Sequence, residues 1–109
     1  MELSEWRMGW LVVLFDLPVK TAELKRAYVK FHRFLLDDGF AMMQYSVYTR
    51  HAPSREHAEK HIARVKRALP YRGEVRIMKL TEAQFARMDI FRGRNPAETE
   101  QPPQQLMIF

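Results

Sequence analysis

The chain has 109 residues, a length that suits one domain with a modest core. Eighteen Lys and Arg residues against thirteen Asp and Glu residues give a formal charge of +5, which favours a polyanionic partner, although a mildly basic surface without such a partner is the alternative. The lack of cysteine excludes disulfides, thiolate metal sites and a cysteine nucleophile. The sequence has no apolar stretch that could cross a bilayer and no basic segment of a signal peptide at its start, so we expect a cytoplasmic protein without a membrane partner.

The first expected element is a central strand. Residues 10–15 form a continuous apolar run that ends at the sequence Asp16-Leu17-Pro18. A strand that is hydrophobic on both faces is typical of the middle of a sheet. Thr21 is the expected N-cap of an amphipathic helix that runs to about Asp38, and Gly39 is its expected C-terminal stop.

The middle of the chain predicts two short strands and a second helix. Residues 40–50 are long enough for two strands with a break near residues 44–46. Ser54 is the expected N-cap of the second helix, and Pro70 closes it. The apolar stripe of this helix consists of Ala58, Ile62, Val65 and Leu69.

The remaining elements complete an α+β pattern. Residues 74–80 alternate polar and apolar side chains, which predicts a half-buried strand, and residues 81–92 predict one helical turn and another strand. The order is β-α-β-β-α-β, which is the pattern of a ferredoxin-like sandwich, here with an extra C-terminal strand. We therefore expect a domain over residues 1–92 and a proline-containing linker over residues 93–105. Apolar residues 106–109 form either a disordered tail or a strand that adds to a sheet edge, including that of a partner subunit.

Asp16 is the first candidate functional residue. A carboxylate at the C-terminal end of a central strand lies where sites often form in α/β architectures. The alternative is that Asp16 hydrogen-bonds its own turn. One carboxylate is too few for Mg²⁺, and no second acidic residue is close in the sequence, so a metal site requires Asp16 of a second subunit across a two-fold axis.

The second candidate site is basic. Four cations of the first helix lie opposite its apolar stripe or flank it, namely Lys25, Arg26, Lys30 and Arg33. The second helix carries Lys60, Arg64 and Arg67 in the same way. Such rows are either solvated faces or, where both helices cover one side of a sheet, a patch for the backbone of duplex nucleic acid.

Three histidines form a weaker candidate. His57 and His61 are four residues apart, and with His51 they could hold a zinc ion, but the stretch does not match His-Glu-x-x-His. The preferred alternative places both helical histidines at the margin of the apolar stripe. Motifs of serine hydrolases, P-loop proteins and dinucleotide-binding proteins are absent from the sequence.

Several segments together resemble the CRISPR-associated protein 2 family. Residues 11–19 (Leu-Val-Val-Leu-Phe-Asp-Leu-Pro-Val) are similar to the first strand and turn of that family, and residues 37–48 resemble its Gly-x-x-x-x-Gln-x-Ser-Val-aromatic signature. Residues 75–81, with Gln84-Phe85, continue a similarity that covers nearly all of residues 8–92. The Phe-Asp-Leu-Pro and Gln-Tyr-Ser-Val-Tyr forms most resemble the variant found with type II, single-effector systems.

The resemblance implies a ferredoxin-like homodimer whose sheets face each other and whose C-terminal strands, here residues 106–109, are swapped. It implies that Asp16 lies near the two-fold axis and binds a divalent metal, Mg²⁺ or Mn²⁺, and that some members cleave RNA or double-stranded DNA. It also implies that the dimer bridges two dimers of the CRISPR integrase and holds a double-stranded prespacer, for which cleavage is dispensable.

Two classes of function follow. In the first, the dimer is a scaffold that binds double-stranded DNA, and the expected contact residues are Lys25, Arg26, Lys30, Arg33 and Arg50. In the second, the protein is a metal-dependent endonuclease, and Asp16 is both its catalytic and its metal-binding residue. We favour the scaffold as the physiological role, because each half-site offers one carboxylate, no evident general base, and only Tyr45 or Ser46 as nearby polar helpers.

Overall fold

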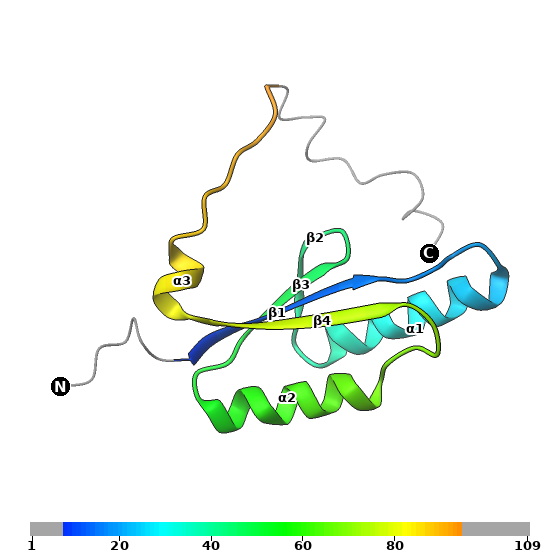
Figure 1. Ribbon diagram of the computed structural model, residues 1–109, viewed down its shortest axis with the longest axis horizontal. Coiled ribbons are helices and arrows are strands. Elements are labelled where there is room, and N and C mark those ends of the chain that lie inside the picture. The colour runs from blue at the N-terminus through cyan, green and yellow to red at the C-terminus, as the bar shows by residue number, and fades with distance from the viewer. Residues whose placement is uncertain (1–7, 95–109) are drawn as a thin grey trace.

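A computed structural model of the protein describes residues 8–94, and within them it contains four strands and three helices (Figure 1). In chain order they are β1 (Met8–Asp16), α1 (Ala22–Asp37), β2 (Ala41–Gln44), β3 (Val47–His51), α2 (Arg55–Arg67), β4 (Glu74–Thr81) and α3 (Glu82–Ala86). The expected β-α-β-β-α-β order, and with it the ferredoxin-like α+β fold, is confirmed.

The sheet has the strand order β2-β3-β1-β4, and every pair is antiparallel. The apolar run of residues 10–15 therefore lies inside the sheet, as predicted, because β1 has a neighbour on each side. Leu11 and Val13 on this strand are completely buried. A strand between two others buries its backbone polar groups in hydrogen bonds, which allows both of its faces to be apolar.

The two long helices begin at the predicted caps. The Thr21 hydroxyl accepts a hydrogen bond from the Leu24 backbone N–H at 3.1 Å, and the Ser54 hydroxyl accepts one from the His57 N–H at 3.1 Å. Gly39 follows the end of α1 at φ 92°, a backbone conformation that favours glycine. α2 ends at Arg67, and Leu69, which we expected in its apolar stripe, is exposed just beyond it.

α1 and α2 cover the same face of the sheet and form the core with it. Leu11, Val13 and Phe15 of β1 belong to one buried cluster with residues of both helices. The rings of Phe15 and Phe31 meet edge to face with centroids 5.2 Å apart. Because side chains alternate along a strand, the intervening residues of β1 lie on the opposite face of the sheet.

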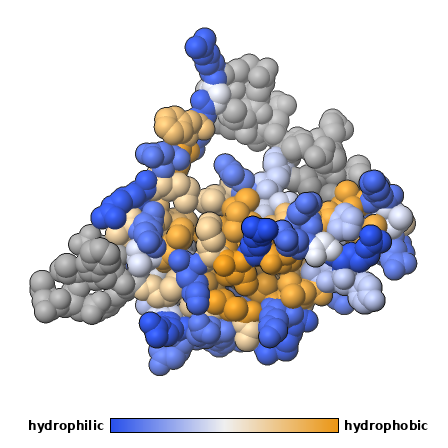
Figure 2. All heavy atoms as spheres, in the orientation of Figure 1, coloured by the Kyte–Doolittle hydropathy of each residue, from blue (hydrophilic) through white to orange (hydrophobic). Residues whose placement is uncertain are grey.

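This opposite face, which we call the open face, carries an apolar centre. It is formed by Trp10, Val12, Leu14 and Asp16 of β1, by Glu74, Arg76, Met78 and Leu80 of β4, and by Val47, Thr49 and His51 of β3. The ring of Phe85 from α3 stacks on Trp10 at one end, with centroids 4.1 Å apart. Figure 2 shows hydrophobic residues gathered in the middle of the molecule, over β1 and β4, with hydrophilic residues around them.

The prediction of a strand after the helical turn is wrong. After the helical turn α3, residues 87–94 form no strand, and Ile90 and Phe91 are exposed. A strand needs a neighbouring edge for its hydrogen bonds, and this segment pairs with neither of the two edge strands, β2 and β4. Within residues 8–94, no helix is long and apolar enough to cross a membrane. Most of the predicted linker (93–105), the predicted strand 106–109 and the first seven residues of the predicted domain (1–92) lie outside the described residues.

Candidate functional site

Asp16 is the last residue of β1, and its side chain is exposed on the open face. The turns on either side hold this strand end. The Phe15 N–H donates to the Ser46 carbonyl oxygen at 3.0 Å, so the β2–β3 turn lies beside it. On the other side, a Cβ on Gly73 would come 2.8 Å from the Asp16 carbonyl oxygen, so the α2–β4 loop packs directly against it. Glycine is needed there, because its φ is 102° and there is no space for a side chain.

Glu74 is the acidic neighbour that sequence reasoning missed. It is the first residue of β4 and stands directly opposite Asp16 in the antiparallel pair of β1 and β4. Side chains of such a pair share a face, and their Cβ atoms are roughly 4.5–5.5 Å apart. Residues 16 and 74 are far apart in the sequence, but the strand order of a ferredoxin-like fold places the end of the first strand beside the start of the last, which was a usable signal.

The donors at this pair suit a hard divalent cation. Two carboxylates with room for water are the protein contribution that Mg²⁺ usually takes. Glu74 Oε1 accepts from the Arg76 Nε–H at 3.1 Å, and both side chains are mostly exposed. The residues present therefore fit Mg²⁺ or Mn²⁺ as one part of a coordination sphere, and phosphate oxygens, waters or a second subunit must supply the rest. The described residues contain no group of three or more His, Cys, Asp or Glu side chains that could hold a metal alone.

The absence of such a group among the described residues also contradicts the zinc site considered for His51, His57 and His61. His51 interacts with Glu82, at 3.0 Å between Nε2 and Oε2, at the far end of β1. His57 and His61 do lie together, with ring centroids 4.7 Å apart. His61, however, is buried and donates from Nδ1 to Asp38 Oδ2 at 2.6 Å. The pair therefore belongs to a structural network rather than to a metal centre.

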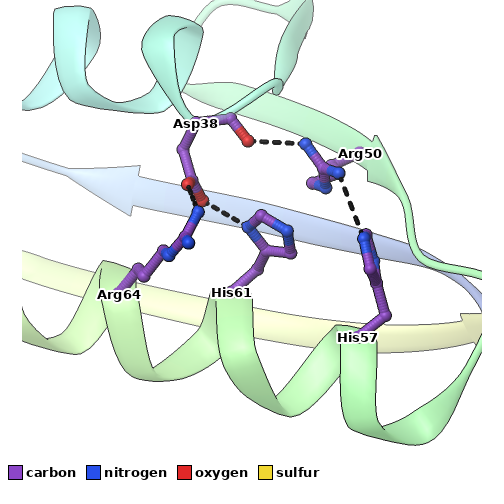
Figure 3. A network of polar contacts seen from close by, with 5 residues as sticks. All are labelled: Asp38, Arg50, His57, His61 and Arg64. Atoms are coloured by element: carbon purple, nitrogen blue, oxygen red, sulfur yellow. Dashed lines mark hydrogen bonds and ion pairs between the residues drawn. The ribbon is translucent and has the colours of Figure 1, made fainter.

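Asp38 is the centre of that network, which ties the end of α1 to α2 (Figure 3). Its Oδ1 accepts from Arg64 Nη1 at 2.9 Å, and its backbone oxygen accepts from Arg50 Nη1 at 2.6 Å. The side chain of Asp38 is only 5% exposed and that of His61 only 3%. A buried carboxylate is tolerated because these donors replace its water.

Arg50, one of the expected nucleic-acid-binding residues, is held by this network. Its Nη1 binds the Asp38 carbonyl oxygen, and its Nη2 lies 3.5 Å from His57 Nε2. A Cβ on Gly39 would come within 1.9 Å of Arg50 Nη1, so the glycine leaves the space that the guanidinium occupies. The structure therefore does not bring Arg50 together with the cations of α1, and its role towards nucleic acid stays a prediction.

The cations of α1 are brought together as predicted. Lys25, Arg26, Lys30 and Arg33 line one shallow depression of about 690 Å³ along the outer side of α1. We call these four residues the α1 basic face. Val29, Phe34 and Asp37 also line this depression. Because α1 and α2 cover the same side of the sheet, Lys60 and Arg67 of α2 lie on that side as well, whereas Arg64 is paired with Asp38.

Burial shifts the pKa of three titratable side chains, Tyr48, His32 and His57. Burial raises the pKa of Tyr48 to about 12, and the nearby Tyr28 adds to this effect. The Tyr48 hydroxyl is hydrogen-bonded to His32 Nδ1, and burial, followed by the charge of Arg33, lowers the pKa of His32. Burial, with the positive neighbours His61 and Arg50, also lowers the pKa of His57. Tyr48 is therefore a core residue of the motif and not a general base.

Fold and site together define a ferredoxin-like α+β protein with an acidic pair at the end of its central strand and a basic helix on its covered face. The family model of the CRISPR associated protein Cas2 matches residues 8–88. The chain belongs to this family, as the sequence motifs indicated.

Curated relatives cover almost the whole chain. A protein of Flavobacterium psychrophilum named "CRISPR-associated endoribonuclease Cas2" is 43% identical over 107 residues, which cover 98% of this chain and 93% of that protein. A protein of Parvibaculum lavamentivorans with the same name is 45% identical over 100 residues, which cover 92% of this chain and 99% of the relative. "CRISPR-associated endoribonuclease Cas2 2" of Rhodospirillum rubrum is 44% identical over 108 residues, covering 95% and 96% of the two chains.

Proposed function

We propose that the chain binds double-stranded DNA as a homodimer and bridges dimers of the CRISPR integrase during spacer acquisition. The observation that carries the proposal is the α1 basic face, in which cations from successive turns of one helix line a common surface. Contacts of this kind are made to phosphates and do not depend on base sequence. A subunit that handles spacers of arbitrary sequence requires such a surface.

The open face supports the homodimer. Helices α1 and α2 cover only one side of the sheet, and Leu14, Met78 and Leu80 on the other side are half-buried or exposed. An apolar surface of this kind is typical of an interface, and a two-fold axis would bring the same face of two copies together. Asp16 and Glu74 lie at one end of this face, beside the surface that a second copy would cover.

The C-terminal residues complete this proposal. Residues 106–109 are strongly apolar and follow a polar segment. We infer that they pair as a strand with the partner subunit, and that deletion of these four residues weakens the dimer and integrase binding. Light scattering and co-elution with the integrase measure both effects. An equally stable truncated dimer that still binds the integrase would refute the swapped strand.

The main test uses the purified dimer with the integrase and a labelled prespacer duplex. We expect the wild-type chain to support integration of the duplex into a CRISPR array and the variant Asp16→Ala to support it equally. Loss of integration in Asp16→Ala, with the fold and duplex binding intact, would show that the scaffold role is wrong and that chemistry at Asp16 is required.

A metal-dependent endonuclease acting on RNA or double-stranded DNA is the second candidate function. Its support is the Asp16–Glu74 pair together with the endoribonuclease names of the relatives. Asp16 and Glu74 would bind Mg²⁺ or Mn²⁺ through carboxylate oxygens, and Arg76 would orient Glu74 through its Nε–H. When bound, such an ion activates water and neutralises charge on the scissile phosphate. Cleavage that is lost in EDTA and restored by Mg²⁺ or Mn²⁺ would support this function.

We further infer that the chain is the variant found with type II, single-effector systems, from the Phe-Asp-Leu-Pro and Gln-Tyr-Ser-Val-Tyr motifs at residues 15–18 and 44–48. The genes beside its own test this inference, because a type II system carries one large effector. We also infer a cytoplasmic location, which cell fractionation tests.

A further inference from the structure

An aromatic and a cationic side chain stand free beside the acidic pair. Tyr71 lies in the loop between α2 and β4 and is fully exposed, at 101% of its reference surface. Among residues 8–94, neither Tyr71 nor the exposed Arg72 has an ion pair, ring contact or side-chain hydrogen bond. A single exposed aromatic residue is ordinary on a protein surface, so its meaning depends on its surroundings.

The loop is held at the end of β1. Gly73, two residues after Tyr71, packs against the carbonyl oxygen of Asp16 and the side chain of Leu17. Glu74 then pairs with Asp16 across the strands. Consecutive Cα atoms are about 3.8 Å apart, so Tyr71 and Arg72 cannot be distant from Asp16. In Figure 1, this loop, the end of β1 and the start of α1 lie at the same end of the molecule.

A small cavity lies between this loop and the start of α1. It has a volume of about 120 Å³, and Tyr71 and Arg72 line it together with Leu17, Pro18, Leu24 and Tyr28. Its volume equals that of about four water molecules and is too small for a drug-sized ligand. Glu23 also contributes to the wall. The other walls are mostly apolar.

We propose that Tyr71 stacks on an unpaired nucleobase at this cavity while Arg72 binds the adjacent phosphate, so that a single-stranded segment of nucleic acid runs past Asp16. A nucleotide combines a flat base with an anionic phosphate. The free ring of Tyr71 can stack on the base, and the neighbouring guanidinium of Arg72 can bind the phosphate. The bases of an intact duplex are already stacked on their neighbours, so the ligand is a single strand or an unpaired end. This inference rests on the proposed binding of nucleic acid and adds a base subsite to it.

Binding of three fluorescent probes tests the subsite: a 12-nucleotide RNA, the DNA of the same sequence, and the blunt DNA duplex. We expect Tyr71→Ala to weaken binding of the single strands about 5- to 150-fold, which is the usual effect of losing one base–aromatic stack, and to leave duplex affinity unchanged. Tyr71→Phe keeps the ring and should keep the affinity. Phe91→Ala is the matched control, because Phe91 is 90% exposed and does not line this cavity. Unequal affinities for RNA and DNA would identify the preferred strand through the 2′-hydroxyl.

A second measurement distinguishes stacking of Tyr71 on a base from electrostatic attraction between the protein and the strand. In a single strand with one 2-aminopurine, we expect the wild-type chain to quench the fluorescence of this base and Tyr71→Ala not to quench it. The inference is overturned if the wild-type chain binds no single strand, if Tyr71→Ala leaves single-strand affinity unchanged, or if it weakens single strand and duplex equally. It is also overturned if Tyr71→Ala changes only the oligomeric state, since the loop would then contact a protein. Failure of the wild-type chain to bind the duplex, with single-strand binding intact, would instead refute the proposed duplex scaffold.

Discussion

Asp16 and Glu74 face each other across the antiparallel pair of β1 and β4, at the end of the open face. The pairing gives each chain two carboxylates where the amino-acid order shows one. A metal site therefore does not require a dimer for its second carboxylate, because one chain supplies the number of carboxylates that Mg²⁺ usually takes from a protein. A metal ion bound here would need phosphate, water or a second subunit to complete its coordination, but not the symmetry mate of Asp16 for a second carboxylate.

The first prediction concerns this pair. If metal-dependent cleavage occurs, Asp16→Asn and Glu74→Gln should each lower its rate by at least about tenfold, since even residues behind metal ligands typically cost 10- to 100-fold. Cleavage of labelled RNA and duplex DNA at several Mg²⁺ concentrations measures the effect. Asp89→Asn, at an exposed position beyond α3, is the control. Full activity in Glu74→Gln would exclude Glu74 from the site while leaving Asp16 in place.

The second prediction concerns the α1 basic face. Each of the substitutions Arg26→Ala, Lys30→Ala and Arg33→Ala should weaken duplex binding and reduce the slope of log affinity against log salt by about 0.9 for every phosphate that the protein no longer neutralises. Titrations at three salt concentrations measure both quantities. Lys79→Ala removes one positive charge from β4 and should leave the slope unchanged. A triple variant with wild-type affinity and slope would show that the duplex binds elsewhere.

The third prediction concerns the Asp38 network. Asp38→Ala leaves the buried Nδ1–H of His61 without its acceptor, so we expect a loss of about 1–3 kcal/mol in the free energy of unfolding. Urea denaturation at a fixed protein concentration measures it. Asp37→Ala is the neighbouring control at an exposed position and should change stability by less than about 0.5 kcal/mol. Equal effects of the two substitutions would mean that the network adds no net stability.

The fourth prediction concerns the core. Phe31 is 1% exposed and contacts the rings of Phe15 and Phe34, so Phe31→Ala should destabilise the fold by about 3–5 kcal/mol. Leu36→Ala, on the same helix but at an exposed position, should cost far less. Thermal and urea denaturation compare the two variants. If Phe31→Ala lowered the free energy of unfolding only slightly, the packing of α1 on β1 would not be the main core of the fold.

The fifth prediction concerns pH. The pKa values of His32 and His57 are lowered from 6.5 in the folded chain, so below about pH 6.5 these two side chains bind more protons in the unfolded chain than in the folded one. The free energy of unfolding should therefore fall as the pH drops below about 6.5, and His57→Gln should make the fall shallower. Urea titrations between pH 5 and 8 measure the slope, and the two proteins should have the same slope above pH 7.5. An unchanged slope at low pH would contradict the assignment to His57.

The amino-acid order alone determined most of the fold. The apolar run before Asp16, the caps Thr21 and Ser54 and the alternation in residues 74–80 are local signals, because each depends on residues within one or two turns of the chain. The family motifs are local in the same sense. The apolar run placed Asp16 at the end of a central strand, the helical period placed four cations on one helix face, and the structure has both arrangements.

Only the tertiary structure decided which distant residues meet. The pairing of Asp16 with Glu74, the binding of Arg50 and His61 by Asp38, and the position of Tyr71 beside the end of β1 join residues that are 12 to 58 positions apart in the chain. Such contacts depend on strand register and helix packing, and a shift of one residue in register would move Glu74 to the other face of the sheet. The missing strand after α3 was also decided at this level, because a strand exists only where its backbone pairs with an edge, and this segment pairs with neither β2 nor β4.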